Sequence, residues 1–314
     1  MRFAPSLASG PRPACGAHPR AATAQPPRRL RRFLVFAAAS ALSATALAGA
    51  ASASSGQDYV AMGDSYTAGS LIPDLAGSPA GCLRSSHNYP ALVAAAIGTG
   101  SFADVSCQGA TTDNMAQAQS VPFGTNPPQL DALSAGTTLV TIGIGGNDLG
   151  FASIVIHCAS LSWTDPFGTP CEDHYTSGGT DQLKAEIDAT VPKVAAVLQA
   201  IHQRAPNARV LLIGYPDILP NSGYGCWPLV PIAFGDVPYL RGVEHDMNQM
   251  LASQAAAGNA TYVDTYTDSI GHDFCQPTGV KWMEGIVPTS PAAPVHPNGL
   301  GEKAMAQQVE AAAG

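Results

Sequence analysis

Residues 57–69 read QDYVAMGDSYTAG, and the rest of the chain is arranged around this stretch. The apolar run Tyr59–Met62 predicts a short buried strand, and Gly63-Asp64-Ser65 predicts an abrupt turn at its carboxyl end. Open α/β sheets bind their ligands in the crevice beyond the carboxyl ends of the strands, where Ser65 can present its hydroxyl and its own N–H. The alternative is an ordinary turn, because Gly, Asp and Ser are common turn formers.

Strand and helix patterns alternate along the chain after this turn. Further strands are predicted at 102–106, 138–144, 209–213 and 261–265. Helices are predicted at 89–97, 149–156, 182–204, 239–256 and from 299 to the end, with loops at 69–86, 158–179 and 214–238. This alternation predicts an α/β fold, a three-layer α/β/α sandwich around a parallel sheet. No internal repeat or linker interrupts it, so we expect residues 54–314 to form one domain.

The first 53 residues have a different composition. They hold seven arginines and no acidic residue, then an Ala-rich apolar run at 33–50 and small residues that offer cleavage after Ala48, Ala50 or Ala53. This is the order of a cleaved secretory signal peptide. The alternative is a membrane anchor, since the run is close to spanning length. Its Ala and Ser content favours cleavage, by the Sec route or, from Arg31-Arg32, by twin-arginine export.

Loss of this segment leaves a strongly acidic chain. Seven of the 15 basic residues lie in it, so eight remain against 23 acidic ones, a formal charge of −15. Such a charge disfavours nucleic acid and anionic membrane as partners. We expect a secreted, soluble, monomeric protein with no stable membrane anchor after cleavage.

Six cysteines remain after the signal, and an even number in an exported chain predicts disulfides. They lie at Cys82, Cys107, Cys158, Cys171, Cys226 and Cys275. About 15 pairings are possible in principle. We predict nearest-neighbour pairing, because each bridge then closes one loop region. The alternative is a zinc site that uses His157-Cys158 and Cys171-x-x-His174, but an oxidising compartment favours the disulfide.

Two later positions resemble Ser65 in following a predicted strand. Residues 138–144 run into Gly145-Gly146-Asn147-Asp148, which places the Asn147 amide at the sheet edge, and Gly109 follows the strand at 102–106. A glycine at such a point often allows close approach of the backbone to a ligand. The alternatives are a plain turn or helix cap and a plain strand-to-loop glycine. We predict that Asp148 caps the following helix.

His296 lies before Pro297-Asn298, which are expected to end a loop and cap the last helix. A single histidine is usually structural or on the surface, but this one lies at a helix mouth. Acyl transfer needs a base to activate a serine hydroxyl, and histidine has a suitable pKa near neutrality. The N–H groups of Ser65 and Gly109 and the Asn147 amide can then stabilise an oxyanion.

Four sequence blocks and their order along the chain resemble those of the SGNH (GDSL-type) hydrolase superfamily. The blocks are Gly63-Asp64-Ser65, Gly109, Gly145-Gly146-Asn147-Asp148 and His296. The resemblance covers essentially all of the chain after the signal. It implies the SGNH hydrolase fold, with a five-stranded, flavodoxin-like parallel sheet. It also implies an oxyanion hole of Ser65, Gly109 and Asn147, with His296 as the base.

The cysteine spacing and the motifs Trp282-Met283-Glu284-Gly285 and His296-Pro297-Asn298 are similar to those of secreted actinobacterial lipases and esterases of that superfamily. Many members carry an acidic residue three positions before the histidine, where this chain has Ala293. The resemblance therefore implies a Ser65–His296 dyad whose imidazole is held by a main-chain carbonyl of Ala293 or Pro294. A carboxylate bonded to Nδ1 would contradict it.

The substrate is less closely defined by the sequence. The resemblance implies hydrolysis of carboxylic esters, with acylglycerols or simple acyl esters first and phospholipids or sugar acetates as alternatives. The apolar residues near the blocks either line an acyl channel or belong to the core; they are Leu71, Ile72, Leu149, Phe151, Ile154, Trp282 and Met283. No metal, nucleotide or flavin motif occurs, so no cofactor is expected. The non-enzymatic alternative is a secreted, disulfide-stabilised binding module.

Overall fold

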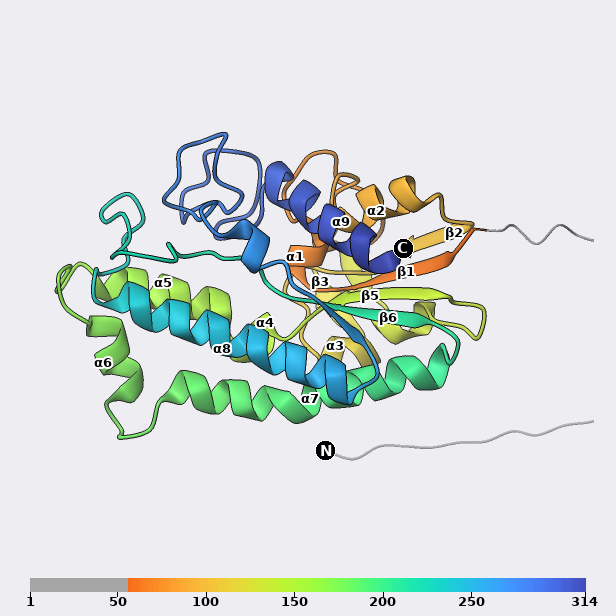
Figure 1. Cartoon of the computed structure of the whole chain (residues 1–314), viewed down its shortest axis with the longest axis horizontal. Coiled ribbons are helices and arrows are strands. Elements are labelled where there is room, and N and C mark those ends of the chain that lie inside the picture. The colour runs from red at the N-terminus through yellow and green to blue at the C-terminus, as the bar shows by residue number, and fades with distance from the viewer. Residues whose placement is uncertain (1–55) are drawn as a thin grey trace, which may run out of the picture. The chain divides into compact units, whose positions relative to one another are not determined.

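Five parallel strands form the central sheet of the computed structural model, which describes residues 56–314 (Figure 1). The predicted signal peptide lies outside the described residues. The strands are β1 (Asp58–Gly63), β2 (Ser101–Asp104), β5 (Leu139–Gly143), β6 (Arg209–Ile213) and β7 (Thr261–Val263). Their order is β2-β1-β5-β6-β7, and every neighbouring pair is parallel. This is the flavodoxin-like order 2-1-3-4-5, as predicted.

Successive residues of the strands point to opposite faces of the sheet, and both faces are buried. Tyr59 and Ala61 of β1 belong to one apolar cluster, and Val60 and Met62 belong to the other. The first face packs against α2 (Tyr89–Ile97) and α9 (Gly299–Ala313), and the second packs against α7 (Gln182–Arg204) and α8 (Asp236–Ala257) (Figure 1). Burial on both sides explains the unbroken apolar strands, and the result is the predicted three-layer sandwich.

The helix caps follow from short polar side chains in the loops. Asn88 accepts a hydrogen bond from the Ala91 N–H at the start of α2, and Asn298 accepts from the Leu300 and Gly301 N–H groups at the start of α9. Asn298 therefore caps the last helix, as expected, and its neighbour His296 lies just before that cap. Such caps contribute about 1 kcal/mol each to helix stability.

Two parts of the predicted layout are wrong. The helix expected at 149–156 is divided into α4 (Gly146–Leu149) and α5 (Phe151–Leu161), because Gly150 adopts a left-handed conformation with φ +80°. The loop expected at 158–179 contains the end of α5 and a further helix, α6 (Pro170–Thr176). Asp148 caps neither α4 nor α5; its carboxylate accepts hydrogen bonds from Thr112 instead.

The remaining elements are short and lie in the connections. They are α1 (Ser65–Ala68), α3 (Asp113–Ala116), the antiparallel hairpin β3 (Gln119–Val121) and β4 (Gly124–Asn126), and the 3₁₀ turns η1 (Ala80–Cys82), η2 (Gln129–Ala132) and η3 (Thr267–Ser269). Within residues 56–314, no helix combines the length and the apolar character needed to cross a membrane.

Three disulfides join neighbouring cysteines in the sequence. They are Cys82–Cys107, Cys158–Cys171 and Cys226–Cys275. The Cys158–Cys171 bridge uses both thiols of the alternative zinc site. No set of three metal-binding side chains gathers in the part of the chain that the structure describes. The Cys82–Cys107 bridge fastens the loop after α1 to the loop that contains Gly109.

Candidate active site

Ser65 begins α1 immediately after the carboxyl end of β1. Gly63 makes the turn possible: its φ is +141°, and a Cβ there would lie 2.5 Å from the Gly143 carbonyl oxygen. The Asp64 carboxylate then accepts a hydrogen bond from the Tyr66 N–H and caps the short helix. Asp64 thus stabilises the turn. In this sheet order β1 lies between β2 and β5, the point where strand order reverses and α/β sheets bind ligands.

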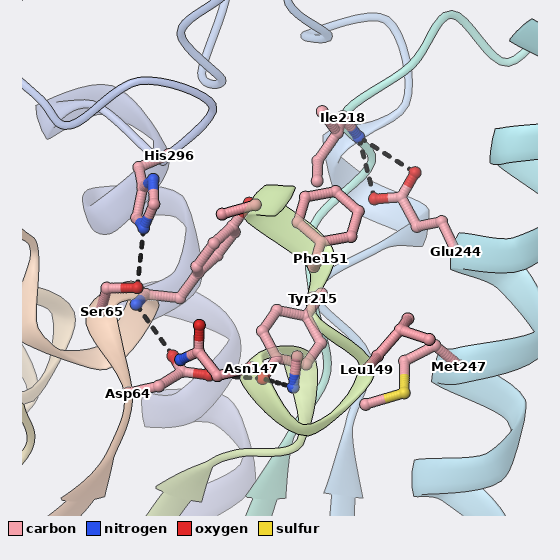
Figure 2. A pocket seen from close by; sticks show the side chains of 13 residues that line it. Asp64, Ser65, Asn147, Leu149, Phe151, Tyr215, Ile218, Glu244, Met247 and His296 are labelled. Carbon is pink, nitrogen blue, oxygen red and sulfur yellow. Dashed lines mark hydrogen bonds between the residues drawn. The ribbon is translucent and has the colours of Figure 1, made fainter. Parts of the chain in front are cut away.

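His296 and Ser65 are 231 positions apart in sequence and lie in hydrogen-bonding contact. Nε2 of His296 is 2.7 Å from Oγ of Ser65 (Figure 2). Nδ1 is 2.7 Å from the carbonyl oxygen of Pro294. A carbonyl can only accept, so Nδ1 carries the proton and Nε2 is free to accept from the serine hydroxyl. Of the two carbonyls suggested by the sequence, that of Pro294 is the partner. The Ala293 N–H donates to the Ser70 carbonyl.

Tyr66 holds the His296 loop against α1. Its hydroxyl donates to the Val295 carbonyl oxygen at 2.6 Å, and its ring lies 4.7 Å from the imidazole ring, centroid to centroid. Val295 adopts the left-handed φ of +61°, which is costly for a β-branched residue and is maintained by such contacts. The residue next to the serine therefore positions the histidine.

Glu284, the nearest carboxylate before His296 in sequence, does not contact the imidazole. Its main-chain N–H donates to the His296 carbonyl oxygen, and its buried carboxylate accepts from Asn298 and Thr289 and pairs with the buried Lys281 at 2.9 Å. Burial alone would raise the pKa of Glu284, but these hydrogen bonds and the lysine outweigh it and lower the pKa to about 2. Glu284 therefore fixes the backbone on which His296 lies.

Burial also affects the imidazole itself. Removal from water lowers the pKa of His296 below its ordinary value, and the hydrogen bond to Pro294 opposes that shift only in part. The imidazole is therefore neutral at physiological pH and able to accept a proton.

Asn147 lies in α4 and Gly109 lies in a loop, and hydrogen bonds join these segments to each other and to the serine turn. The Asn147 side chain donates to the Ala110 carbonyl oxygen at 2.9 Å, and Cys107 N–H donates to the Gly63 carbonyl oxygen at 3.0 Å. Gly109 is exposed and adopts a left-handed φ of +72°. Among residues 56–314 no hydrogen bond engages the N–H of Ser65 or Gly109, so both groups are available as donors.

Tyr215 links the serine turn to the asparagine turn, and the sequence did not single it out. Its hydroxyl donates to Asp64 Oδ2 at 2.6 Å and accepts from the Gly146 N–H at 2.8 Å (Figure 2). A Cβ on Gly146 would lie 3.0 Å from that hydroxyl oxygen, so the glycine allows the contact. Tyr215 follows β6 by two residues, and its place just beyond a central strand is the signal that could have revealed it. Burial raises the pKa of Asp64 to about 7, although the hydrogen bonds from Tyr215 and from the Tyr66 N–H lower it.

A pocket opens beside the side chains of Ser65 and His296. Its walls are mainly apolar and come from α1, α4, α5, the segment after β6, and α8; they include Leu149, Phe151, Tyr215, Ile218 and Met247 (Figure 2). Glu244 of α8 also lines it, and both of its carboxylate oxygens face the Ile218 N–H. A lining that is mainly apolar, with a few polar groups, is typical of a site for a small, largely apolar ligand.

Only part of the suggested acyl channel lines this pocket. Leu149 and Phe151 do, whereas Ile72, Ile154 and Met283 are buried elsewhere in the domain. Trp282 stacks on the His272 ring, and Leu71 is exposed. Met247 and Glu244 were not expected, because a helix pattern does not reveal which of its buried residues faces a cavity.

Comparison with known proteins agrees with this geometry. The model of the GDSL-like Lipase/Acylhydrolase family matches residues 61–304. Lipase 2 of Streptomyces coelicolor is 40% identical over 267 residues, which cover 84% of this chain and 88% of that protein. Among solved structures, the extracellular lipase of Streptomyces rimosus has a TM-score of 0.67 at 29% identity, and phospholipase A1 of Streptomyces albidoflavus NA297 has 0.67 at 27%. Each alignment covers 82% of this chain and 99% of that structure. The chain therefore belongs to the GDSL-like lipase/acylhydrolase family of carboxylic ester hydrolases.

Proposed function

We propose that the protein is a secreted lipase or esterase that works through an acyl-enzyme on Ser65, with His296 as the only side-chain base. The observation that carries this proposal is the pair of 2.7 Å contacts of the imidazole, one to Ser65 Oγ and one to the Pro294 carbonyl oxygen. They leave Nε2 unprotonated and directed at the hydroxyl that it must activate.

In the first half of the reaction, His296 Nε2 takes the Ser65 proton while Oγ attacks the ester carbonyl carbon. The carbonyl π electrons move to oxygen and form the tetrahedral oxyanion. When the intermediate collapses, the bond to the alcohol oxygen breaks, and the alcohol leaves with the proton from Nε2. In the second half, Nε2 takes a proton from water, the hydroxide attacks the acyl-enzyme, and the proton returns to Oγ as the acid leaves.

The oxyanion is stabilised by the N–H groups of Ser65 and Gly109 and by the Asn147 amide. The two N–H groups are not engaged elsewhere in the described residues, and Asn147 Nδ2 has a second hydrogen besides the one given to Ala110. Loss of one such donor typically costs about 2.7–4 kcal/mol of transition-state stabilisation. A carbonyl stabilises the imidazolium less than a carboxylate does, so the preorganised donors carry more of the catalysis.

The apolar pocket favours an ester of a fatty acid over an acetyl ester. Leu149, Phe151 and Met247 offer an acyl chain hydrophobic contact beside the serine. Acylglycerols and simple acyl esters are the proposed substrates. Phospholipids are a second candidate, because one of the similar structures is a phospholipase A1.

Export of a single folded domain is part of the same proposal. Residues 1–53 act as the cleaved signal, and residues 54–314 form the mature, monomeric enzyme, stabilised by three disulfides that suit an oxidising compartment. The similar lipase of Streptomyces rimosus is described as extracellular.

The test is hydrolysis of p-nitrophenyl esters of increasing chain length by the mature protein and its Ser65→Ala variant. We expect the rate to rise from acetyl to medium-chain esters in the unmodified protein and to fall by more than about 1,000-fold in the variant. Equal rates in the two proteins would leave only the binding-module reading. Release of fatty acid from phosphatidylcholine, compared with a triacylglycerol emulsion, then separates the two substrate classes.

A further inference from the structure

Five large apolar side chains are exposed on three segments, 162–169, 221–235 and 285–295. They are Trp163, Phe167, Tyr224, Leu229 and Val287, called here the apolar rim. Trp163 exposes 62% of its surface, and Phe167 and Val287 expose 78% each. Single exposed apolar residues are common, but a group of this size is typical of an interaction surface.

Packing contacts bring the first two rim segments together. The Trp163 ring lies 5.3 Å from that of Trp227, and the Phe167 ring lies 5.6 Å from that of Phe234, centroid to centroid. The Phe234 N–H also donates to the Pro166 carbonyl oxygen at 2.9 Å. The segment after α5 is therefore joined to the segment before α8, which carries Tyr224 and Leu229.

A second set of contacts joins these segments to the active site. A Cβ on Gly285 would lie 3.1 Å from a methyl group of Val230, so the segment of Leu229 packs against the segment of Val287. The Val295 N–H donates to the Gly285 carbonyl oxygen at 3.1 Å, directly before His296. In Figure 1 the teal segment before α8 and the blue segment before α9 lie at the same end of the domain.

The rim segments are almost without charge. Residues 162–169, 221–235 and 285–295 contain one charged side chain, Asp165, although the chain after residue 53 has a formal charge of −15. A surface with no basic residue does not attract anionic lipid, and the acidic remainder of the protein repels it. Exposed Trp and Tyr suit the boundary between water and hydrocarbon, because their rings are apolar and their polar atoms remain hydrated.

We propose that the apolar rim docks the protein on the surface of uncharged or zwitterionic lipid and so presents the Ser65–His296 pocket to esters held in that surface. The inference rests on the proposed function for its substrate, but the docking itself does not require hydrolysis. A second copy of the chain is the competing occupant of the same surface.

Binding is measured with the mature Ser65→Ala protein, so that the lipid is not consumed. On vesicles of phosphatidylcholine we expect cosedimentation and a blue shift of tryptophan emission, since Trp163 moves out of water. Phe167→Ser and Leu229→Ser each lower the partition coefficient about tenfold, the effect of losing one apolar side chain from contact. The matched control is Phe123→Ser, which removes an even more exposed phenylalanine from the β3–β4 turn and leaves binding unchanged.

Three results would overturn the proposal: unchanged binding of the rim variants, equal loss in the Phe123 control, or tighter binding to phosphatidylglycerol than to phosphatidylcholine. A dimer in sedimentation velocity that Leu229→Ser dissociates would assign the rim to a second copy instead. The same substitutions in the protein with Ser65 intact should leave hydrolysis of water-soluble p-nitrophenyl acetate unchanged. Vesicle binding by Ser65→Ala tests docking, and loss of hydrolysis in the same variant tests the proposed chemistry. The two proposals can therefore fail separately.

Discussion

The Tyr215 hydroxyl donates a 2.6 Å hydrogen bond to the carboxylate of Asp64, the residue before the candidate nucleophile. Because the same hydroxyl accepts from the Gly146 N–H, one side chain sets the spacing between the turn of Ser65 and the turn of Asn147. Both turns carry proposed oxyanion donors. Tyr215 is therefore a positioning residue that acts through the main chain.

Tyr215→Phe should lower kcat about 10- to 100-fold with little change in KM, because small displacements of catalytic groups are costly in rate. Steady-state kinetics with a soluble ester measures the split. Tyr59→Phe is the matched control, since that buried hydroxyl bonds Thr141 within the same sheet at 2.8 Å and neither Asp64 nor Gly146. Equal losses of kcat in the two variants would assign Tyr215 a role in folding alone.

Asn147→Ala should lower kcat about 100- to 1,000-fold, the usual effect of removing an oxyanion donor. Its amide also bonds the Ala110 carbonyl, so a structural loss has to be separated from a catalytic one. Thermal unfolding of the variant, together with the KM for the same ester, makes that distinction. A variant with native stability and unchanged kcat would remove Asn147 from the oxyanion hole.

The rate should depend on a neutral His296. Burial lowers the pKa of this imidazole, and activity requires the unprotonated form, so kcat/KM should rise with pH along a limb whose midpoint lies below about 6.5 and remain high above it. A pH-stat assay with an uncharged ester measures this limb. The carboxyl of Asp64, with a pKa of about 7, is the other group whose titration has to be separated from that of His296. Tyr215→Phe separates the two, because it removes a hydrogen bond that lowers the pKa of Asp64 and leaves the His296 limb in place. A midpoint well above 6.5 would contradict the assignment.

Glu284→Gln should destabilise the domain by about 3–5 kcal/mol at pH 7, because it leaves Lys281 buried without its partner. The folded pKa of about 2 lies below the ordinary value of about 4.3, so the stabilisation is complete above about pH 4.3 and is lost as the pH falls toward 2. Denaturant unfolding at several pH values measures it, and the difference between the two proteins should shrink in that window. Asp131→Asn, in an exposed pair with Arg204, is the control and should cost about 1 kcal/mol or less.

Much of the fold could be predicted because its signals are local. The central strands β1, β5 and β6 are buried and mainly apolar, and the turn after β1 is fixed by a glycine that must adopt φ +141°. Helix α6 was missed because tertiary contacts stabilise it: the Asp236 carboxylate accepts from the Cys171 and Glu172 N–H groups at its first turn. No pattern within residues 158–179 contains that carboxylate.

The sequence predicted those parts of the site whose chemistry depends on single residue types at particular positions. A serine and an asparagine just past central strands, and a histidine before a helix cap, point to one sheet edge. The choice of the Pro294 carbonyl over that of Ala293 depends on the left-handed Val295, which sequence does not reveal. Tyr215 was overlooked because a tyrosine after a strand is ordinary until its hydroxyl is seen between two turns.

The most direct test of the Ser65–His296 dyad is to trap the acyl-enzyme. The mature protein is mixed with excess p-nitrophenyl ester, quenched in acid and digested, and the peptide that contains Ser65 is weighed by mass spectrometry. We predict one acyl group per chain on Ser65, with accumulation at least about 1,000-fold slower in His296→Ala. An acyl group on another residue, or acylation of Ser65 at the normal rate without His296, would contradict the dyad.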